Sequence, residues 1–208
     1  PKNIRLGDIT VSGLTSGSIT LETESELILN GANVRSIIFG PGEGGDISAT
    51  SDILSLTDGG RIRTSTNGSG NGGDIIIDAR QFTLQGIDGR ISGLGTDTRL
   101  GSSGDGGTIR INENGDPGTV EIVGVDSQPF TPDPNNPSSF LRATLLETGF
   151  TTATLGTGDS GDLLINASQL DVSNGAGITT SSLGLDEDAG NGGTLRLTAN
   201  TADFRGLA

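Results

Sequence analysis

The chain has 208 residues and a formal net charge of −14, with 26 acidic residues against 12 Lys and Arg. This balance excludes nucleic-acid binding through a basic surface and disfavours docking to anionic membranes. The sequence holds 36 Gly, which is a high share for a globular protein, and it has no Cys, Met, Trp, Tyr or His. The apolar residues are almost all Ile, Leu, Val and Ala, which favours a narrow core of stacked aliphatic side chains over the broad core of a globular enzyme.

A Gly-rich turn followed by alternating aliphatic residues recurs along the chain. The Asp or Thr of successive clear copies is separated by 28, 34, 54 and 32 residues, and a weaker copy precedes them. The copies are Ser16-Gly17-Ser18-Ile19, Gly44-Gly45-Asp46-Ile47, Gly72-Gly73-Asp74-Ile75, Gly106-Gly107-Thr108-Ile109, Ser160-Gly161-Asp162-Leu163 and Gly192-Gly193-Thr194-Leu195. A repeat of this size indicates a solenoid, in which each unit buries its apolar face only by stacking on its neighbours.

Each unit carries three short segments in which apolar and polar residues alternate. In one unit these are Ile75–Ala79, Phe82–Leu84 and a segment from Ile91 onward. Alternation between glycine-rich turns predicts β-strands. We therefore predict an all-β parallel β-helix (β-solenoid), with three short strands per coil and about six coils, as a single unit over residues 1–208. An antiparallel sandwich, the alternative, gives no reason for the near-constant interval.

The alignment of the units predicts two vertical ladders of core side chains. One is Ile19, Ile47, Ile75, Ile109, Leu163 and Leu195; the other is Val34, Ile62, Ile91 and Ile178. The interval of 54 residues is explained by an insertion of about 22 residues in the fourth coil, since Phe150–Gly156 parallels Ile178–Gly184. This insertion, within residues 123–149, is rich in Pro, which favours an extended excursion, and Phe140–Glu147 could form a short helix. Phe130, Asp133 and Phe140 are its candidate partner contacts.

The fifth unit resembles a known family. Its run Gly161-Asp162-Leu163-Leu164-Ile165-Asn166-Ala167-Ser168-Gln169-Leu170-Asp171-Val172, followed by Gly175-Ala176-Gly177-Ile178-Thr179-Thr180, resembles the large filamentous-haemagglutinin-like exoproteins of bacteria. The resemblance covers about residues 17–206. It implies a long right-handed parallel β-helix, export through an outer-membrane transporter of the two-partner type, and a role in adhesion or surface structure. The family's amino-terminal secretion domain is not recognisable in this sequence, so export is an inference. Function depends on particular sites and not on the fold, so the resemblance names no ligand.

The acidic residues at the repeated turn have two interpretations. Asp46, Asp74 and Asp162 occupy one repeat position, and a stack of carboxylates with turn carbonyls could bind Ca²⁺. Alternatively, each Asp caps its own turn by accepting hydrogen bonds from local backbone N–H groups. The same position holds Ser or Thr in other units, which favours capping. Elsewhere, three arginines that follow an Asp by two or three residues are expected to form surface ion pairs of little energy: Arg61, Arg90 and Arg99 with Asp58, Asp88 and Asp97.

These observations predict a structural or adhesive β-helical stalk of a secreted or cell-surface exoprotein, without catalytic residues or an assigned cofactor. Expected partners are a host or neighbouring-cell surface or matrix component, the transporter during export, and other copies end to end. The chain is expected to be a segment of a longer repeat protein, because neither end offers a polar cap. Two alternatives stay open. One is a β-helical polysaccharide-active enzyme, although no carboxylate pair carries a signature. The other is a self-assembling surface-layer or filament subunit.

Overall fold

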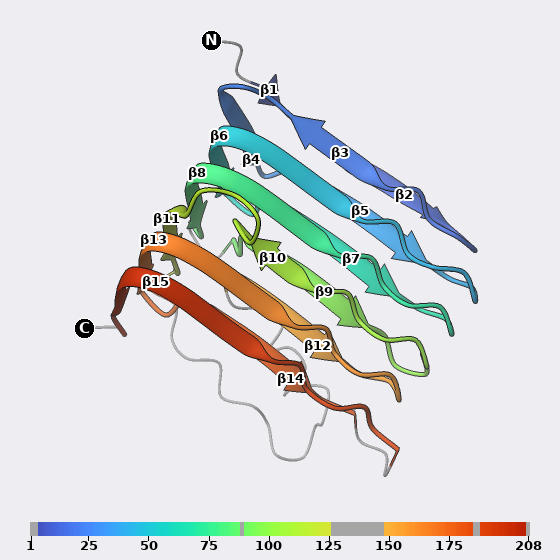
Figure 1. Cartoon of the computed structure of the whole chain (residues 1–208). Coiled ribbons are helices and arrows are strands. Elements are labelled where there is room, and N and C mark those ends of the chain that lie inside the picture. Colours follow the sequence, from blue (N-terminus) through green and yellow to red (C-terminus); the bar gives the residue numbers. More distant parts are fainter. Residues whose placement is uncertain (1–3, 88–89, 126–147, 185–187, 207–208) are drawn as a thin grey trace.

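In a computed structural model of the chain, residues 4–87, 90–125, 148–184 and 188–206 are described. They form fifteen β-strands and no helix. All pairings between these strands are parallel, and the strands belong to two sheets. The chain therefore winds as a stack of about six coils, which Figure 1 shows from one side. The candidate contacts Phe130, Asp133 and Phe140 and the expected helix lie outside the described residues.

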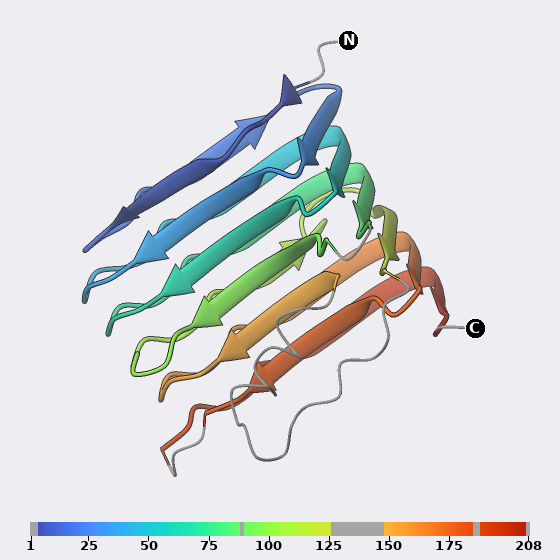
Figure 2. The same ribbon diagram turned by 180° about the vertical axis from the view of Figure 1, so that it is seen from behind.

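Sheet A forms two sides of the stack and sheet B the third, which faces the viewer in Figure 2. Sheet A contains β1 (Ile4–Arg5), β3 (Ile19–Glu22), β4 (Glu26–Asn30), β6 (Ile47–Thr57), β8 (Ile75–Gln85), β10 (Ile109–Ile111), β11 (Gly118–Val123), β13 (Leu163–Ser173) and β15 (Leu195–Phe204). Sheet B runs in the order β2 (Ile9–Gly13), β5 (Asn33–Ile38), β7 (Arg61–Thr66), β9 (Gly93–Thr98), β12 (Gly149–Thr154) and β14 (Gly177–Ser182).

The first two predicted segments of a coil are joined in most coils. β6, β8 and β13 are each 11 residues long and span both segments. Each bends at a corner residue that interrupts the register, as Asp52 and Arg80 do between paired neighbours on β6 and β8. The alternation of buried residues changes phase at this corner, so both arms face the core. In the first and fourth coils the two segments stay separate, as β3 and β4 and as β10 and β11.

The first predicted ladder is confirmed. Ile19, Ile47, Ile75, Ile109, Leu163 and Leu195 pair in register from coil to coil. The first five are buried, whereas Leu195 is 41% exposed because no described strand lies beyond β15. Burial of an aliphatic side chain contributes roughly 1.5–3 kcal/mol, so this column is a main source of stability.

The second predicted ladder is wrong at one rung. Val34 pairs with Ile62, as predicted, but Ile62 pairs with Leu94. Leu94 in turn pairs with Phe150, so Ile91 does not belong to the column. The chain makes a small antiparallel bridge between Ile87 and Arg90, which delays the start of β9 to Gly93. The predicted match of Phe150 with Ile178 is confirmed.

Aromatic and hydroxyl side chains complete the core beside sheet B. The rings of Phe82 and Phe150 stack with centroids 5.6 Å apart, which joins β8 to β12 across the interior. Buried threonines fix the glycine-rich turns: Thr66 Oγ1 donates to the carbonyl of Gly70 at 2.6 Å. Thr154 makes the equivalent bond to Gly158, also at 2.6 Å. The hydroxyls of Thr66 and Thr154 are satisfied by the turns that they hold.

The described residues contain no helix of the length and apolar character needed to cross a membrane.

Candidate functional site

The repeated Asp position forms a hydrogen-bonded column along one edge of the stack. Asp46 Oδ1 accepts the backbone N–H of Asp74 at 2.8 Å, and Asp74 Oδ1 accepts that of Thr108 at 2.7 Å. Asp162 Oδ1 accepts the backbone N–H of Thr194 at 2.7 Å. Each carboxylate therefore caps the turn of the following coil. The capping hypothesis placed these bonds within the same turn, and in this respect it was wrong.

A second polar column lies three residues before the first and was not predicted. Asn71 Oδ1 accepts the backbone N–H of Asp105 at 2.9 Å, and Asp105 Oδ1 accepts that of Asp159 at 2.8 Å. Asp159 Oδ1 in turn accepts the backbone N–H of Asn191 at 2.6 Å. The sequence signal was present, because an Asn or Asp precedes the Gly-rich pair in four units.

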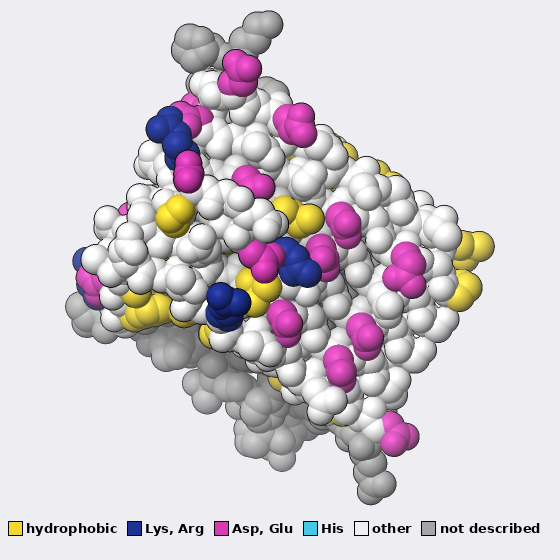
Figure 3. Space-filling model, in the orientation of Figure 1, with side chains coloured by type: hydrophobic (Ala, Val, Ile, Leu, Met, Phe, Trp, Pro, Cys, Tyr) yellow, Lys and Arg dark blue, Asp and Glu magenta, His cyan; other side chains and the backbone are white. Residues whose placement is uncertain are grey.

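Both columns use their carboxylates to satisfy backbone groups of neighbouring coils. No cluster of three or more Asp, Glu, His or Cys that could hold a metal ion occurs among the described residues. On the face shown in Figure 3, the acidic side chains are spread out and do not gather in one place. The calcium hypothesis for Asp46, Asp74 and Asp162 therefore gains no support from the geometry.

A different surface combines charge with a hollow. The outward positions of sheet B form columns across the strands, and two of them change from Arg to Gly. Arg61 on β7 pairs with Gly93 on β9, and Gly93 pairs with Gly149 on β12. Arg35, Arg63, Gly95 and Thr151 form the neighbouring column. Because glycine has no side chain, the surface sinks at these positions into a shallow hollow that is open to solvent.

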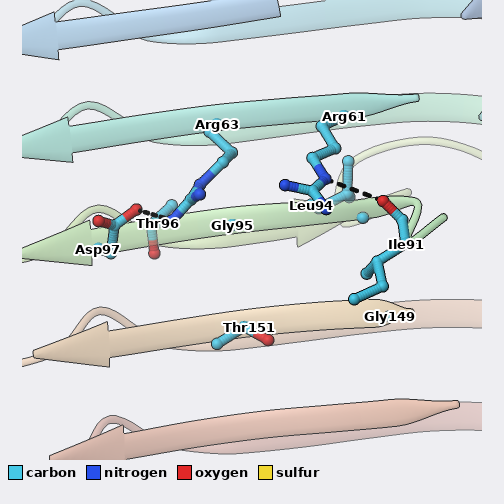
Figure 4. A pocket seen from close by; sticks show the side chains of 10 residues that line it. Arg61, Arg63, Ile91, Leu94, Gly95, Thr96, Asp97, Gly149 and Thr151 are labelled. Atoms are coloured by element: carbon cyan, nitrogen blue, oxygen red, sulfur yellow. Dashed lines mark hydrogen bonds and ion pairs between the residues drawn. The ribbon is translucent and has the colours of Figure 1, made fainter. Parts of the chain in front are cut away.

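We call this hollow the arginine groove. It is lined by Arg61, Arg63, Ile91, Gly93, Leu94, Gly95, Thr96, Asp97, Gly149 and Thr151. Figure 4 shows the side chains of Arg61 and Arg63 reaching from β7 toward β9. A Cβ added to Gly95 would lie 3.5 Å from Arg63 Nε, so the Arg63 side chain lies close over this glycine.

A buried carboxylate holds Arg63 in place. Asp97 Oδ1 lies 2.7 Å from Arg63 Nη2 and accepts the hydroxyl of Ser65 at 2.9 Å. Asp97 Oδ2 lies 3.1 Å from Arg99 Nε. The Asp97 side chain is 2% exposed, so the expected surface pair with Arg99 is in fact a buried anion shared by two arginines.

The ion pairs predicted for Arg90 and Arg61 also differ from those in the structure. Arg90 pairs with Asp58 at 3.1 Å, whereas Asp88 lies outside the described residues. Arg61 makes no ion pair with a described carboxylate; its Nε donates to the carbonyl of Ile91 at 2.8 Å. Partial burial of the Arg61 guanidinium, together with the positive charges of Arg63 and Arg35, lowers its pKa.

The groove therefore carries excess positive charge in a strongly acidic protein. Arg35 also has no described carboxylate within ion-pair distance, and its Nε is buried without a hydrogen-bond partner. Guanidinium groups recognise planar oxyanions through paired N–H donors. The arrangement is suited to binding an anionic group.

Comparison with protein-family models, with curated proteins and with solved structures finds no match for this chain.

The family resemblance of the fifth unit thus remains a hypothesis, and the functional argument depends on the geometry.

The other hollows contain fewer charged side chains that could bind or activate a ligand. Three further hollows formed by described residues contain one carboxylate or none, with Glu113 in one and Asp52 in another. The hydrolase alternative requires two cooperating carboxylates, and the four hollows do not bring such a pair together.

Proposed function

We propose that this chain is part of a structural and adhesive stalk of a secreted or cell-surface bacterial exoprotein. The observation that carries the proposal is the continuous column from Ile19 to Leu195, in which one position of each successive coil pairs with the same position of the next. Many hydrogen bonds between coils and one continuous core keep such a stack from bending, and a rigid spacer requires both.

The handedness of the coils, the family likeness and the net charge fit the same proposal. We assign a right-handed winding to the coils, because parallel crossover connections within a sheet are right-handed in about 98% of cases. The likeness of residues 161–180 to filamentous-haemagglutinin-like exoproteins supports the surface role and export through an outer-membrane transporter. The net charge of −14 suits a solvent-exposed rod.

Surface display is tested by immunolabelling. Antibodies raised against the purified chain are applied to intact cells of the source bacterium and to permeabilised cells. We expect intact cells to be labelled and the label to disappear after external protease treatment. Labelling that requires permeabilisation would contradict the proposal.

Adhesion is tested separately with beads. Beads coated with the chain are expected to bind host-cell or matrix-coated surfaces more strongly than beads coated with another protein of equal negative charge. Equal retention of both bead types would remove the adhesive half of the proposal and leave the structural half.

A further inference from the structure

The arginine groove has the properties of a binding site that the stalk itself does not require. A rigid spacer needs only polar, soluble side chains on its outer faces, and sheet B places like charges next to one another instead. Arg35 and Arg63 are partners in register on adjacent strands, about 4.8 Å apart. Close like charges at such positions destabilise a sheet, so their presence calls for a counter-charge.

Asp97 supplies only part of that counter-charge. It is shared by Arg63 and Arg99, and Asp8 acts at a distance on Arg35. Arg61 uses Nε to bind the Ile91 carbonyl, which fixes its side chain over the groove while its terminal nitrogens make no hydrogen bond with described residues. An oxyanion placed beside Arg61 would neutralise positive charge that no described carboxylate neutralises.

We propose that the arginine groove binds the carboxylate of an acidic sugar, with Arg61 as the main contact and Arg35 and Arg63 beside it. The proposal deepens the adhesive function and rests on it for its biological setting, although binding can be measured independently. It assigns the stalk a ligand class: sugar chains that carry ring carboxylates.

The dimensions and the lining favour a sugar over a peptide. The groove crosses β7, β9 and β12 over about 10 Å and is shallow, so a flat sugar ring can lie across it with its carboxylate beside Arg61. An extended peptide commonly binds by adding to a free sheet edge or by inserting apolar side chains into pockets. At the groove the strand edges are already paired, since β9 pairs with β7 on one side and with β12 on the other. The groups that line the hollow and are partly exposed include the backbone of Gly93 and Gly95 and the side chain of Thr151, which suit sugar hydroxyls.

The charge of the whole chain favours a carboxylate over a phosphate. A protein with a net charge of −14 repels a dianion more strongly than a monoanion. A single carboxylate also fits the planar donor pair of one guanidinium. The arginine groove therefore favours a ligand group that carries a single negative charge.

The experiment titrates the isotopically labelled chain with galacturonate, a sugar with one carboxylate, and follows backbone amide shifts. We expect saturable shifts at Gly93, Gly95 and Thr151. The methyl ester of galacturonate, which keeps the sugar and removes the charge, is expected to cause none. Absence of shifts with galacturonate, or shifts confined to other parts of the chain, would overturn the proposal.

Variants locate the contact. Arg61→Gln is expected to weaken binding about tenfold or more, the usual effect of losing a charge-assisted hydrogen bond. Arg80→Gln, on the corner of sheet A, removes the same charge and is expected to leave binding unchanged. Unchanged binding by a folded Arg61→Gln variant would refute the assignment. If Arg61→Gln lowers the Tm, Arg35→Gln replaces it, because the Arg35 side chain makes no hydrogen bond with described residues.

An acetylated and amidated Gly-Glu-Gly tripeptide, which carries one carboxylate, distinguishes the source of the carboxylate. We expect it to bind at least several-fold more weakly than galacturonate, because it lacks the sugar hydroxyls. Equal affinity would overturn the sugar assignment. These results do not depend on where the protein resides, so failure of surface labelling and failure of the groove proposal are distinguishable.

Discussion

Glycine at the repeated turn is required by the distance between coils. Gly17, Gly45, Gly73, Gly107 and Gly161 form a column in which each residue lies against the carbonyl of the one before it. A Cβ on Gly107 would lie 1.9 Å from the carbonyl oxygen of Gly73, and one on Gly161 would lie 1.9 Å from that of Gly107. These clashes involve backbone atoms, which cannot move aside without separating the coils. Gly17 begins the column, and its Cβ would make an ordinary contact at 3.7 Å.

The first prediction compares two glycine substitutions at equivalent positions. Gly107→Ala is expected to lower the free energy of unfolding by about 3 kcal/mol or more, because the added methyl group separates two coils. Gly17→Ala is expected to change it by less than about 1 kcal/mol. Chemical denaturation followed by circular dichroism measures both. A similar effect of the two substitutions would show that backbone entropy, and not the approach of the coils, explains the glycine column.

The residue scale also shows where sequence reasoning succeeds and fails. The ladder through Ile47 and Ile75 was predictable, because it depends only on the spacing of alternating aliphatics from a glycine turn. The arginine groove was not, because it depends on which residue of β9 stands beside Arg63. The prediction placed Ile91 in that strand, and the bridge at Ile87 shifts the register by three residues. Only the observed register places Gly95 beside Arg63 and buries Asp97.

At the scale of elements, the fourth coil is paired on both sides of the insertion. β11 pairs with β8 and β13, and β12 pairs with β9 and β14. The insertion was predictable from the interval between repeats, since the flanking segments keep their place in the alignment. In the next coil the equivalent connection is only Asn174-Gly175-Ala176, with left-handed φ values of 54° and 72° at the first two residues.

The second prediction replaces residues 124–148 with the linker Asn-Gly-Ala of the next coil. We expect the variant to fold and to be as stable as the parent chain or up to about 2 kcal/mol more stable, because a shorter loop loses less entropy on closure. A matched variant with Val-Val-Ala is expected to be less stable by about 1–3 kcal/mol, since β-branched residues resist positive φ. Thermal unfolding compares the three proteins. A large loss of stability with Asn-Gly-Ala would mean that the insertion supports the coil.

The whole molecule combines a large negative charge with carboxylates used inside the coil network. Asp8 Oδ1 accepts the backbone N–H of Asn33 at 2.8 Å and its side-chain amide at 3.2 Å. These bonds, with a smaller contribution from the charge of Arg35, lower the pKa of Asp8 from 3.8. The hydrogen bond from Arg80 likewise lowers the pKa of Asp52 from 3.8. Both carboxylates join neighbouring coils, so their ionisation is linked to stacking.

The third prediction concerns acid unfolding. A carboxyl whose pKa is lower in the folded chain stabilises the fold above its unfolded pKa, and this contribution is lost as the pH falls through the folded value. Asp8→Asn is therefore expected to have a lower Tm than the parent chain at about pH 6, with the difference disappearing below about pH 3. Arg80→Gln is expected to behave in the same way, because it removes the partner of Asp52. The measurement is Tm against pH for the three proteins. A difference that stays constant across this range would show that the two carboxylates act through packing and not through charge.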